Sequence, residues 1–187
     1  HSFWQKILGP DYVEKMFTWA HEANPNAELV INDYNIESTI GKREGMYNFV
    51  KEMLAKNVPI SAVGLQMHIS VNDPPVEQIE ETINMFGELG LKVLVTEMDV
   101  SVYNFEDKER IEYTPELLEK QAQRYKEIFE CFKRCAKKGY LTDVVLWGTM
   151  DSRSWKNDFP VPGRTDIPLL FDGKGKAKPS FYSITEE

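Results

Sequence analysis

The chain has 187 residues, of which 42% are hydrophobic and 28% charged, and this composition indicates a soluble globular protein with a sizeable core. A formal net charge of -8 argues against nucleic acid or an anionic membrane as a partner, and no apolar run is long enough to span a bilayer. The charge is compatible with a neutral ligand such as a sugar. Aromatic residues make up 12% of the chain and include four tryptophans, whose amphipathic rings suit stacking on sugar faces.

The cysteines and histidines do not form a metal-binding pattern. Cys131 and Cys135 lie four residues apart on a predicted helix, and the histidines at 1, 21 and 68 are scattered. We therefore expect ordinary thiols and no metal or other cofactor, and cysteine usage leaves the redox compartment open. The first residues lack the basic and apolar regions of a secretory signal, so no leader is expected in this chain.

Helical and extended patterns alternate along the chain. Helices are predicted at 11–24, around 46–54, from Pro74-Pro75 to Leu89-Gly90, from Thr114-Pro115 to about Lys138, and at 179–184. Strands are predicted at 28–32, 61–67, 92–100 and 143–147, and residues 160–177 form a loop rich in Pro and Gly.

This alternation predicts an α/β fold, with a parallel sheet and right-handed crossovers. Four strands cannot close an eight-stranded barrel, which typically needs about 250 residues. An open four-stranded sheet and the second half of a (β/α)8 barrel therefore both stay open. The chain has no Gly-x-Gly-x-x-Gly and no phosphate loop, which weakens the open nucleotide-binding sheet. We expect the half barrel, with residues 1–187 as one unit.

Polar side chains gather where the predicted strands end. The run 92–100 leads through Val and Leu residues into Glu97 and Asp99, two carboxylates that point to the same side. The other strand ends carry Asn32, Asp33, Tyr34, Asn35, Gln66, His68, Trp147, Asp151 and Trp155. In parallel α/β folds the carboxyl ends of strands carry the chemistry, so these groups are expected on one rim.

Acid, imidazole, amide and indole groups on one rim suit the cleavage of a polyhydroxylated substrate. Carboxylates act as nucleophile and general acid in glycoside hydrolysis. His68 can keep Glu97 ionised through a hydrogen bond, and Asp99 can fix the tautomer of His68. Structural explanations stay open: a strand histidine is often structural, Trp147 can belong to the core, Asn32-Asp33 can open a turn, and Asp151 can cap one.

Five segments together resemble glycoside hydrolase family 10, the retaining endo-β-1,4-xylanases. They read Asn-Asp-Tyr-Asn-Ile-Glu at 32–37, Gly-Leu-Gln-Met-His-Ile at 64–69, Val-Thr-Glu-Met-Asp-Val at 95–100, Trp-Gly-Thr-Met-Asp-Ser-Arg-Ser-Trp at 147–155, and Pro-Leu-Leu-Phe-Asp at 168–172 with Lys178-Pro179 and Tyr182. The segments follow the family's order and spacing, and they cover nearly the whole chain.

The resemblance implies strands five to eight, the C-terminal half, of a (β/α)8 TIM barrel. It implies that Glu97 is the nucleophile, that His68 hydrogen-bonds Glu97, and that Asp99 supports His68. Its implied substrate contacts are Asn32 and Gln66 near the cleavage point, Tyr34 on the aglycone side, and Trp147 and Trp155 around the sugar before the scissile bond. It also implies a secreted, periplasmic or cell-surface protein.

One departure from the family dominates the expected function. The family's acid/base Glu follows a strand of the type Trp-Asp-Val-Val-Asn-Glu, and no such run occurs in these residues, which resume the family pattern at about Phe3-Trp4. The sugar-binding Lys, His and Trp of the first half are absent too. Retention needs two carboxyls about 5–5.5 Å apart, and this chain supplies one. We therefore expect the chain alone to be inactive, or nearly so, on xylan.

The expected partners are xylan or xylo-oligosaccharides and the N-terminal half of the barrel. Strands beginning at Glu28 and Asp143 would each present an unpaired edge, so the chain alone is expected to pair with a second copy as a homodimer of half barrels, or to aggregate. Two other functions stay open: a non-catalytic carbohydrate-binding or assembly module that keeps the aromatic rim, and a β-glucanase or cellulase of the same architecture.

Overall fold

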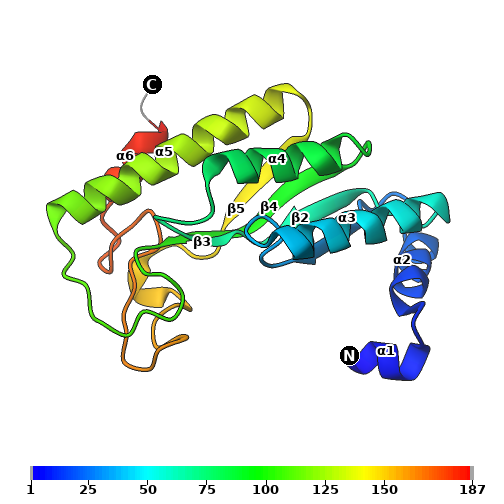
Figure 1. Ribbon diagram of the computed structural model, residues 1–187, viewed down its shortest axis with the longest axis horizontal. Helices are drawn as coiled ribbons and strands as arrows, with labels where there is room; N and C mark the ends of the chain where they lie inside the picture. Colours follow the sequence, from blue (N-terminus) through cyan, green and yellow to red (C-terminus); the bar gives the residue numbers. More distant parts are fainter. Residues whose placement is uncertain (1, 186–187) are drawn as a thin grey trace.

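The computed structural model describes residues 2–185 and shows a parallel sheet with helices layered on one face (Figure 1). The strands are β1 (Val30–Asp33), β2 (Ala62–Leu65), β3 (His68–Ser70), β4 (Lys92–Ser101) and β5 (Leu141–Leu146). Strand β2 lies between β1 and β4, and β5 pairs with the other side of β4. The short β3 pairs with β4 beyond the end of β2. These parallel pairings confirm the predicted α/β class.

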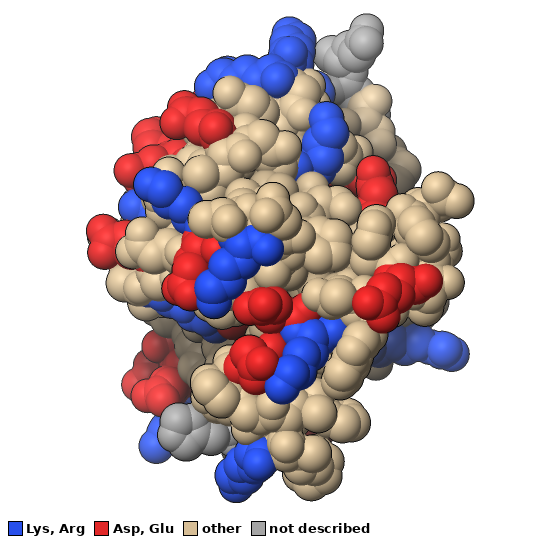
Figure 2. Space-filling model, turned by 90° about the vertical axis from the view of Figure 1, so that its right-hand side faces the viewer, with Lys and Arg blue, Asp and Glu red and all other residues tan. Residues whose placement is uncertain are grey.

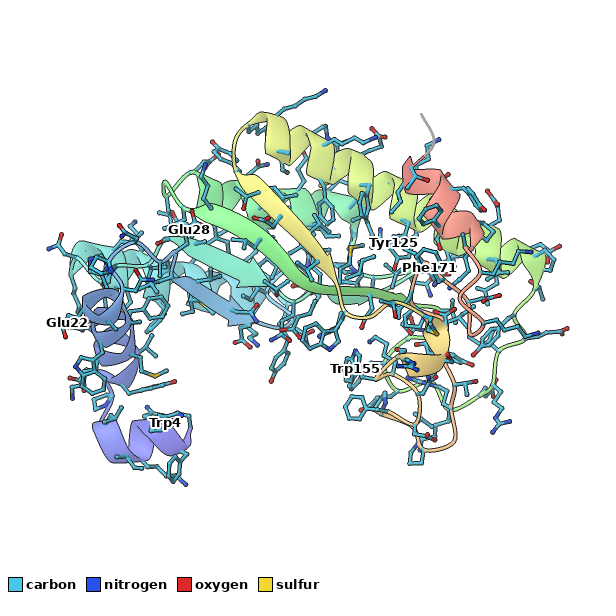
Figure 3. The ribbon with its side chains drawn as sticks, turned by 180° about the vertical axis from the view of Figure 1, so that it is seen from behind. Trp4, Glu22, Glu28, Tyr125, Trp155 and Phe171 are labelled. Carbon is cyan, nitrogen blue, oxygen red and sulfur yellow. The ribbon has the colours of Figure 1, made fainter. Side chains whose placement is uncertain are left out.

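The helices divide into three that cover the sheet and three that lie toward its ends. They are α1 (Phe3–Leu8), α2 (Tyr12–Ala23), α3 (Ile40–Ala55), α4 (Val76–Gly87), α5 (Pro115–Lys137) and α6 (Pro179–Thr185), with a 3₁₀ turn η1 (Asp151–Arg153). Figure 1 shows α3, α4 and α5 over one face, α6 against α5, and α1 and α2 extending from the opposite end. Seen from behind in Figure 3, the strands face the viewer with no helix of the described chain in front of them.

The core lies between the sheet and its covering helices. Apolar residues recur three or four positions apart on α4 and α5, so each helix directs one continuous apolar face toward the strands. The buried members are Ile79, Ile83 and Phe86 on α4, Tyr125, Ile128 and Phe132 on α5, and Val63, Leu65, Val93 and Val95 on the strands. Cys131 and Cys135 are free thiols buried on α5, as expected.

The structure differs from the sequence prediction at two places. The predicted strand 61–67 is split, because Met67 has a positive φ of 56° that ends β2 and lets the chain restart as β3. Helix α1 was not predicted, since six residues are too few to show a helical period. It begins where the Ser2 hydroxyl accepts a hydrogen bond from the Gln5 amide, and it ends at Gly9, whose φ is 89°.

The sheet has two open edges. Within residues 2–185, β1 pairs only with β2, and β5 pairs only with β4, so the edges predicted at 28–32 and 143–147 are confirmed. The homodimer or aggregate expected from them stays a prediction. Figure 2 shows acidic and basic side chains interspersed on the face that it draws, without a continuous patch of either sign. No helix in the described part of the chain has the length and apolar character needed to cross a membrane.

Two helical glycines make a matched test of this packing. A methyl group added to Gly87 of α4 would overlap with the ring of Tyr140, whereas one added to Gly45 of α3 meets no atom within 4 Å. We expect Gly87→Ala to lower the free energy of unfolding by about 1–3 kcal/mol through overpacking. Gly45→Ala should raise it by about 0.5–1 kcal/mol, because alanine is the better helix former. Urea unfolding measures both, and a Gly87→Ala chain as stable as the wild type would contradict the packing of Tyr140.

Glu37 is a buried acid in the segment between β1 and α3. Its side chain has no exposed surface, and neither carboxylate oxygen bonds another residue within 2–185. Loss of water around this carboxyl raises its pKa from 4.5 to about 7. The folded state therefore keeps a proton that the unfolded chain releases between these two pH values.

This proton makes the stability of the chain depend on pH. Below pH 4.5 the carboxyl of Glu37 is protonated in both the folded and the unfolded state, so its burial lowers the free energy of unfolding only a little. As pH rises to about 7 the unfolded state ionises first, so the free energy of unfolding falls, by about 3 kcal/mol in total at 1.36 kcal/mol per pKa unit. We expect Glu37→Gln to remove this fall, because glutamine does not ionise. In urea unfolding, the free energy of unfolding of the variant minus that of the wild type should therefore grow by about 3 kcal/mol between pH 4.5 and 8. Parallel stability curves would contradict the assignment.

Candidate active site

The candidate site residues come together because the strands end in register. Residue pairing places His68 of β3 directly beside Asp99 of β4. Strand β2 ends at Leu65, which pairs with Val95 of β4. Glu97 lies two residues beyond this last pair, so β2 does not cover its side chain. Strand β4 itself continues to Ser101, so Glu97 and Asp99 lie within the strand and their side chains share one face.

Glu97, His68 and Asp99 form a continuous row. Glu97 Oε2 lies 3.4 Å from His68 Nε2, and His68 Nδ1 lies 3.1 Å from Asp99 Oδ2. With a carboxylate at each ring nitrogen, only the doubly protonated imidazolium donates to both. The imidazole of His68 therefore lies between the two carboxylates and contacts both.

Asp99 is buried, and three cationic or donor groups compensate its charge. Its side chain has no exposed surface. Besides His68, the indole Nε1 of Trp155 donates to its Oδ2 at 2.8 Å, and Lys156 Nζ lies 3.4 Å from its Oδ1. A buried carboxylate is tolerated when it is paired in this way. Trp155 is thus fixed in place by the same acid that supports His68.

Asn32 holds the other oxygen of Glu97. Its Nδ2 donates to Glu97 Oε1 at 3.1 Å, while its Oδ1 accepts from the Thr96 hydroxyl at 2.8 Å. The Thr96 contact fixes which end of the amide faces Glu97. Gly64 makes room for it, since a Cβ there would lie 2.7 Å from Asn32 Oδ1. Neither Thr96 nor Gly64 was assigned this role from the sequence, although both stand inside the segments that carry the family resemblance.

A pocket of about 550 Å³ opens beside Glu97. Of the eight residues predicted for the site, its lining includes Tyr34, Gln66, His68, Glu97, Trp147 and Trp155. The other two, Asn32 and Asp99, make the contacts described above with Glu97 and His68. Tyr34 is half-exposed, and Lys42 Nζ lies 3.5 Å from the centre of its ring while pairing with Asp33 at 3.0 Å.

Asp151, gathered with the rim residues from the sequence, has a structural role. Its Oδ1 accepts from the Leu169 amide at 2.9 Å, and its Oδ2 pairs with Lys178 at 3.0 Å. Both side chains are 5% exposed. Removal of water raises the pKa of Asp151 and lowers that of Lys178, and their mutual attraction opposes both changes. The pair ties η1 to the start of α6.

The pocket supplies a single carboxylate to a bound molecule. Glu97 is the only acid among the described residues that line it. The described residues also contain no group of three His, Cys, Asp or Glu side chains that could hold a metal ion. The arrangement can therefore present one carboxylate to a bound molecule between aromatic side chains.

The sequence of the chain matches a known protein family over its whole length. The family model described as Glycosyl hydrolase family 10 matches residues 1–187. The chain belongs to glycosyl hydrolase family 10. It is similar to an endo-1,4-beta-xylanase of Geobacillus stearothermophilus, with 40% identity over 98% of this chain and 55% of that protein.

Solved structures agree with this assignment. The chain superimposes on the structure described as GH10 from Paenibacillus barcinonensis with a TM-score of 0.96 and 42% identity, covering 99% of this chain and 55% of that one. It also matches an intracellular xylanase of Thermoanaerobacterium saccharolyticum, solved with xylotriose, with a TM-score of 0.86 and 42% identity over 99% of this chain and 52% of that one. The chain spans about half the length of these proteins and is the C-terminal half of the family's TIM barrel.

Three further residues of the candidate site were missed from the sequence. Lys156 pairs with Asp99, and Phe105 and Phe159 line the pocket. Lys156 follows Trp155 directly, but nothing in the sequence indicates that its ammonium is buried. The two phenylalanines stand in loops without periodicity, where the sequence gives no signal that they meet.

A matched pair of substitutions tests the bond between Trp155 and Asp99. Trp155→Phe keeps a ring but removes the donor to a buried carboxylate, which should lower the free energy of unfolding by about 1.5–3 kcal/mol. Trp147 is similarly exposed, and its indole makes no hydrogen bond within residues 2–185. Trp147→Phe should therefore change the stability by only about 0.5 kcal/mol. Equal losses in urea unfolding would show that the Asp99 bond adds no stability.

Proposed function

We propose that this chain is the nucleophile-bearing half of a retaining endo-1,4-β-xylanase, which hydrolyses β-1,4-xylosidic bonds in xylan. The observation that supports this most is the restraint on Glu97: Asn32 donates to one of its oxygens, and His68 Nε2 lies 3.4 Å from the other. The side chain of Glu97 is 17% exposed and lines the pocket. A carboxylate held in a fixed orientation suits attack on an anomeric carbon.

The reaction that these residues support has two steps. Glu97 forms a bond to the anomeric carbon of the sugar as the glycosidic bond breaks, and the leaving oxygen needs a proton from a general acid. Water then cleaves the glycosyl ester and frees Glu97. His68 and Asn32 hold the carboxylate, Asp99 holds His68, Trp147 and Trp155 enclose the reacting sugar, and Tyr34 and Gln66 contact neighbouring groups.

The general acid is assigned to a segment outside these 187 residues. Retention needs a second carboxyl about 5–5.5 Å from the first, and Glu97 is the only acid that lines the pocket within 2–185. We infer that an N-terminal half supplies it by pairing with the open edges of β1 and β5. On this account the chain alone hydrolyses xylan slowly or not at all.

A second candidate function is a non-catalytic carbohydrate-binding or assembly module. The observation in its favour is the same single carboxylate combined with a pocket that keeps two exposed tryptophans. A third candidate is a β-glucanase or cellulase of the same architecture, which would differ from a xylanase only in the details of the pocket. The secreted, periplasmic or cell-surface location stays a prediction.

Complementation distinguishes these functions. The chain is mixed with a polypeptide that carries the first four strands of a family 10 barrel, and release of reducing sugar from xylan is measured. We expect activity on mixing only, with the β-anomer as the first product in NMR spectra. Glu97→Gln should lower kcat by about 10⁴-fold or more, as loss of a covalent nucleophile does. Glu106→Gln, an exposed acid on the loop after β4, is the control and should be as active as the wild type.

Each outcome decides between the candidates. Activity that survives Glu97→Gln would contradict the assigned nucleophile. Binding of xylo-oligosaccharides without hydrolysis in the mixture would favour the binding module. Cleavage of β-glucan in preference to xylan would move the function to the third candidate. Wild-type-like turnover by the chain alone would contradict the assignment of the acid to another segment.

A further inference from the structure

A groove of about 810 Å³ lies where α5, α6 and the turn at 172–177 meet. Figure 1 shows α5 and α6 side by side along this junction. The groove is lined by Glu119, Ala122 and Lys126 on α5, by Lys176 on the turn, and by Tyr182 and Ser183 on α6. None of these residues lines the pocket beside Glu97. The groove is therefore separate from the candidate active site.

Tyr182 gives the groove an exposed aromatic ring. It is 47% exposed, and the ring of Phe181 lies 5.4 Å from it, edge to face. Phe181 in turn lies 5.2 Å from Phe171, and both phenylalanines pack against the core. Figure 3 shows Phe171 beside α6. The ring of Tyr182 is thus backed by buried rings and stays open to the groove, an arrangement that suits stacking on the apolar face of a sugar.

Hydrogen bonds hold the walls of the groove in place. The hydroxyl of Ser183 donates to the carbonyl oxygen of Ala122 at 2.9 Å, which fastens α6 to α5. In the turn, the carboxylate of Asp172 accepts from the amides of Lys174 at 2.8 Å and Lys176 at 2.9 Å. The backbone that carries Lys176 is therefore fixed beside α6. Walls that are already ordered lower the entropy that is lost when a ligand binds.

The groove also holds two cations without a partner. The ammonium groups of Lys126 and Lys176 make no hydrogen bond and no ion pair within residues 2–185. Glu119 is the only acid among the described residues that line the groove, so one positive charge is left over. The whole chain has a net charge of -8, which repels anions from most of its surface. A carboxylate is therefore attracted to this groove rather than to the surface around it.

We propose that this groove is a second, non-catalytic binding site for xylan that carries uronic acid side groups. Tyr182 stacks against a neutral sugar unit of the main chain, and Lys126 and Lys176 bind the carboxylate of a side group. The site keeps the polymer attached while the pocket beside Glu97 takes up another part of it. The inference rests on the proposed function for the nature of the polymer, and on the groove alone for the site.

The test measures adsorption of the chain to two insoluble xylans, with Glu97→Gln present throughout so that no bound sugar is cleaved. One xylan carries glucuronic acid side groups, and the other is the same material with its carboxyl groups reduced to alcohols. We expect Lys126→Gln/Lys176→Gln to raise the Kd for the acidic xylan by about two- to tenfold and to leave the Kd for the reduced xylan unchanged. Lys133→Gln/Lys137→Gln removes the same charge from α5 outside the groove and is the control, so it should change neither Kd.

A second variant and a second measurement locate the binding. Tyr182→Ala should raise the Kd for both xylans by about two- to tenfold, because the unit that stacks on the ring is neutral. In NMR spectra of the isotope-labelled chain, xylotriose that carries one glucuronic acid group should shift the amide signals of Ala177, Tyr182 and Ser183.

Failure of the groove and failure of the proposed function give different results. Equal Kd values for the lysine variant and its control on the acidic xylan, or amide shifts confined to Gln66, His68 and Glu97, overturn the second site and leave the xylanase assignment standing. An equal loss on both xylans, or no binding to either by the unsubstituted groove, overturns it too. Weaker binding of the acidic xylan alone supports the site, even when the reassembled barrel does not hydrolyse xylan.

Discussion

The buried carboxylate of Asp99 joins the three parts of the chain that make the site. It belongs to β4, contacts His68 at the start of β3, and accepts from Trp155 beyond β5. Without it the imidazole would lose the group that orients it toward Glu97, and the indole would lose its hydrogen bond to β4. Lys156 supplies the charge that makes such burial tolerable. The orientation of the candidate nucleophile therefore depends on a buried acid that does not line the pocket.

Backbone geometry decides where this acid can act. The positive φ of Met67 interrupts the extended chain after β2. The chain then resumes as β3, whose first residue, His68, pairs with Asp99 of β4. On the same side of β4, Gly64 of β2 leaves space for the amide of Asn32, and Thr96 sets the direction of that amide. Glu97 is held between Asn32 of β1 and His68 of β3. The aromatic side chains that line the pocket beside Glu97 come mainly from the loops after β4 and β5.

Much of this could be predicted from the sequence, because strand and helix periods are local. The alternation gave the parallel sheet, and the rule that sites form at strand ends brought Glu97, His68 and Asn32 together. The partners that depend on tertiary packing could not be predicted. Nothing local distinguishes Lys156 from an exposed lysine, or Phe105 and Phe159 from loop residues that never meet. Asp151 looked like a rim residue, and only the fold shows that Lys178 pairs with it.

The central claim is the proposal that Glu97 is the nucleophile of this half barrel and that its general acid comes from another segment. A 2-deoxy-2-fluoro-xylobioside with a dinitrophenolate leaving group tests it, because that group departs as an anion and needs no proton. The bond to dinitrophenolate breaks as the ester to Glu97 forms, and the fluorine slows its hydrolysis. Mass spectrometry of the digested chain should show the added glycosyl mass on the peptide that contains Glu97, with one dinitrophenolate released per chain. Labelling at another residue, or none with the N-terminal half supplied, would contradict the claim.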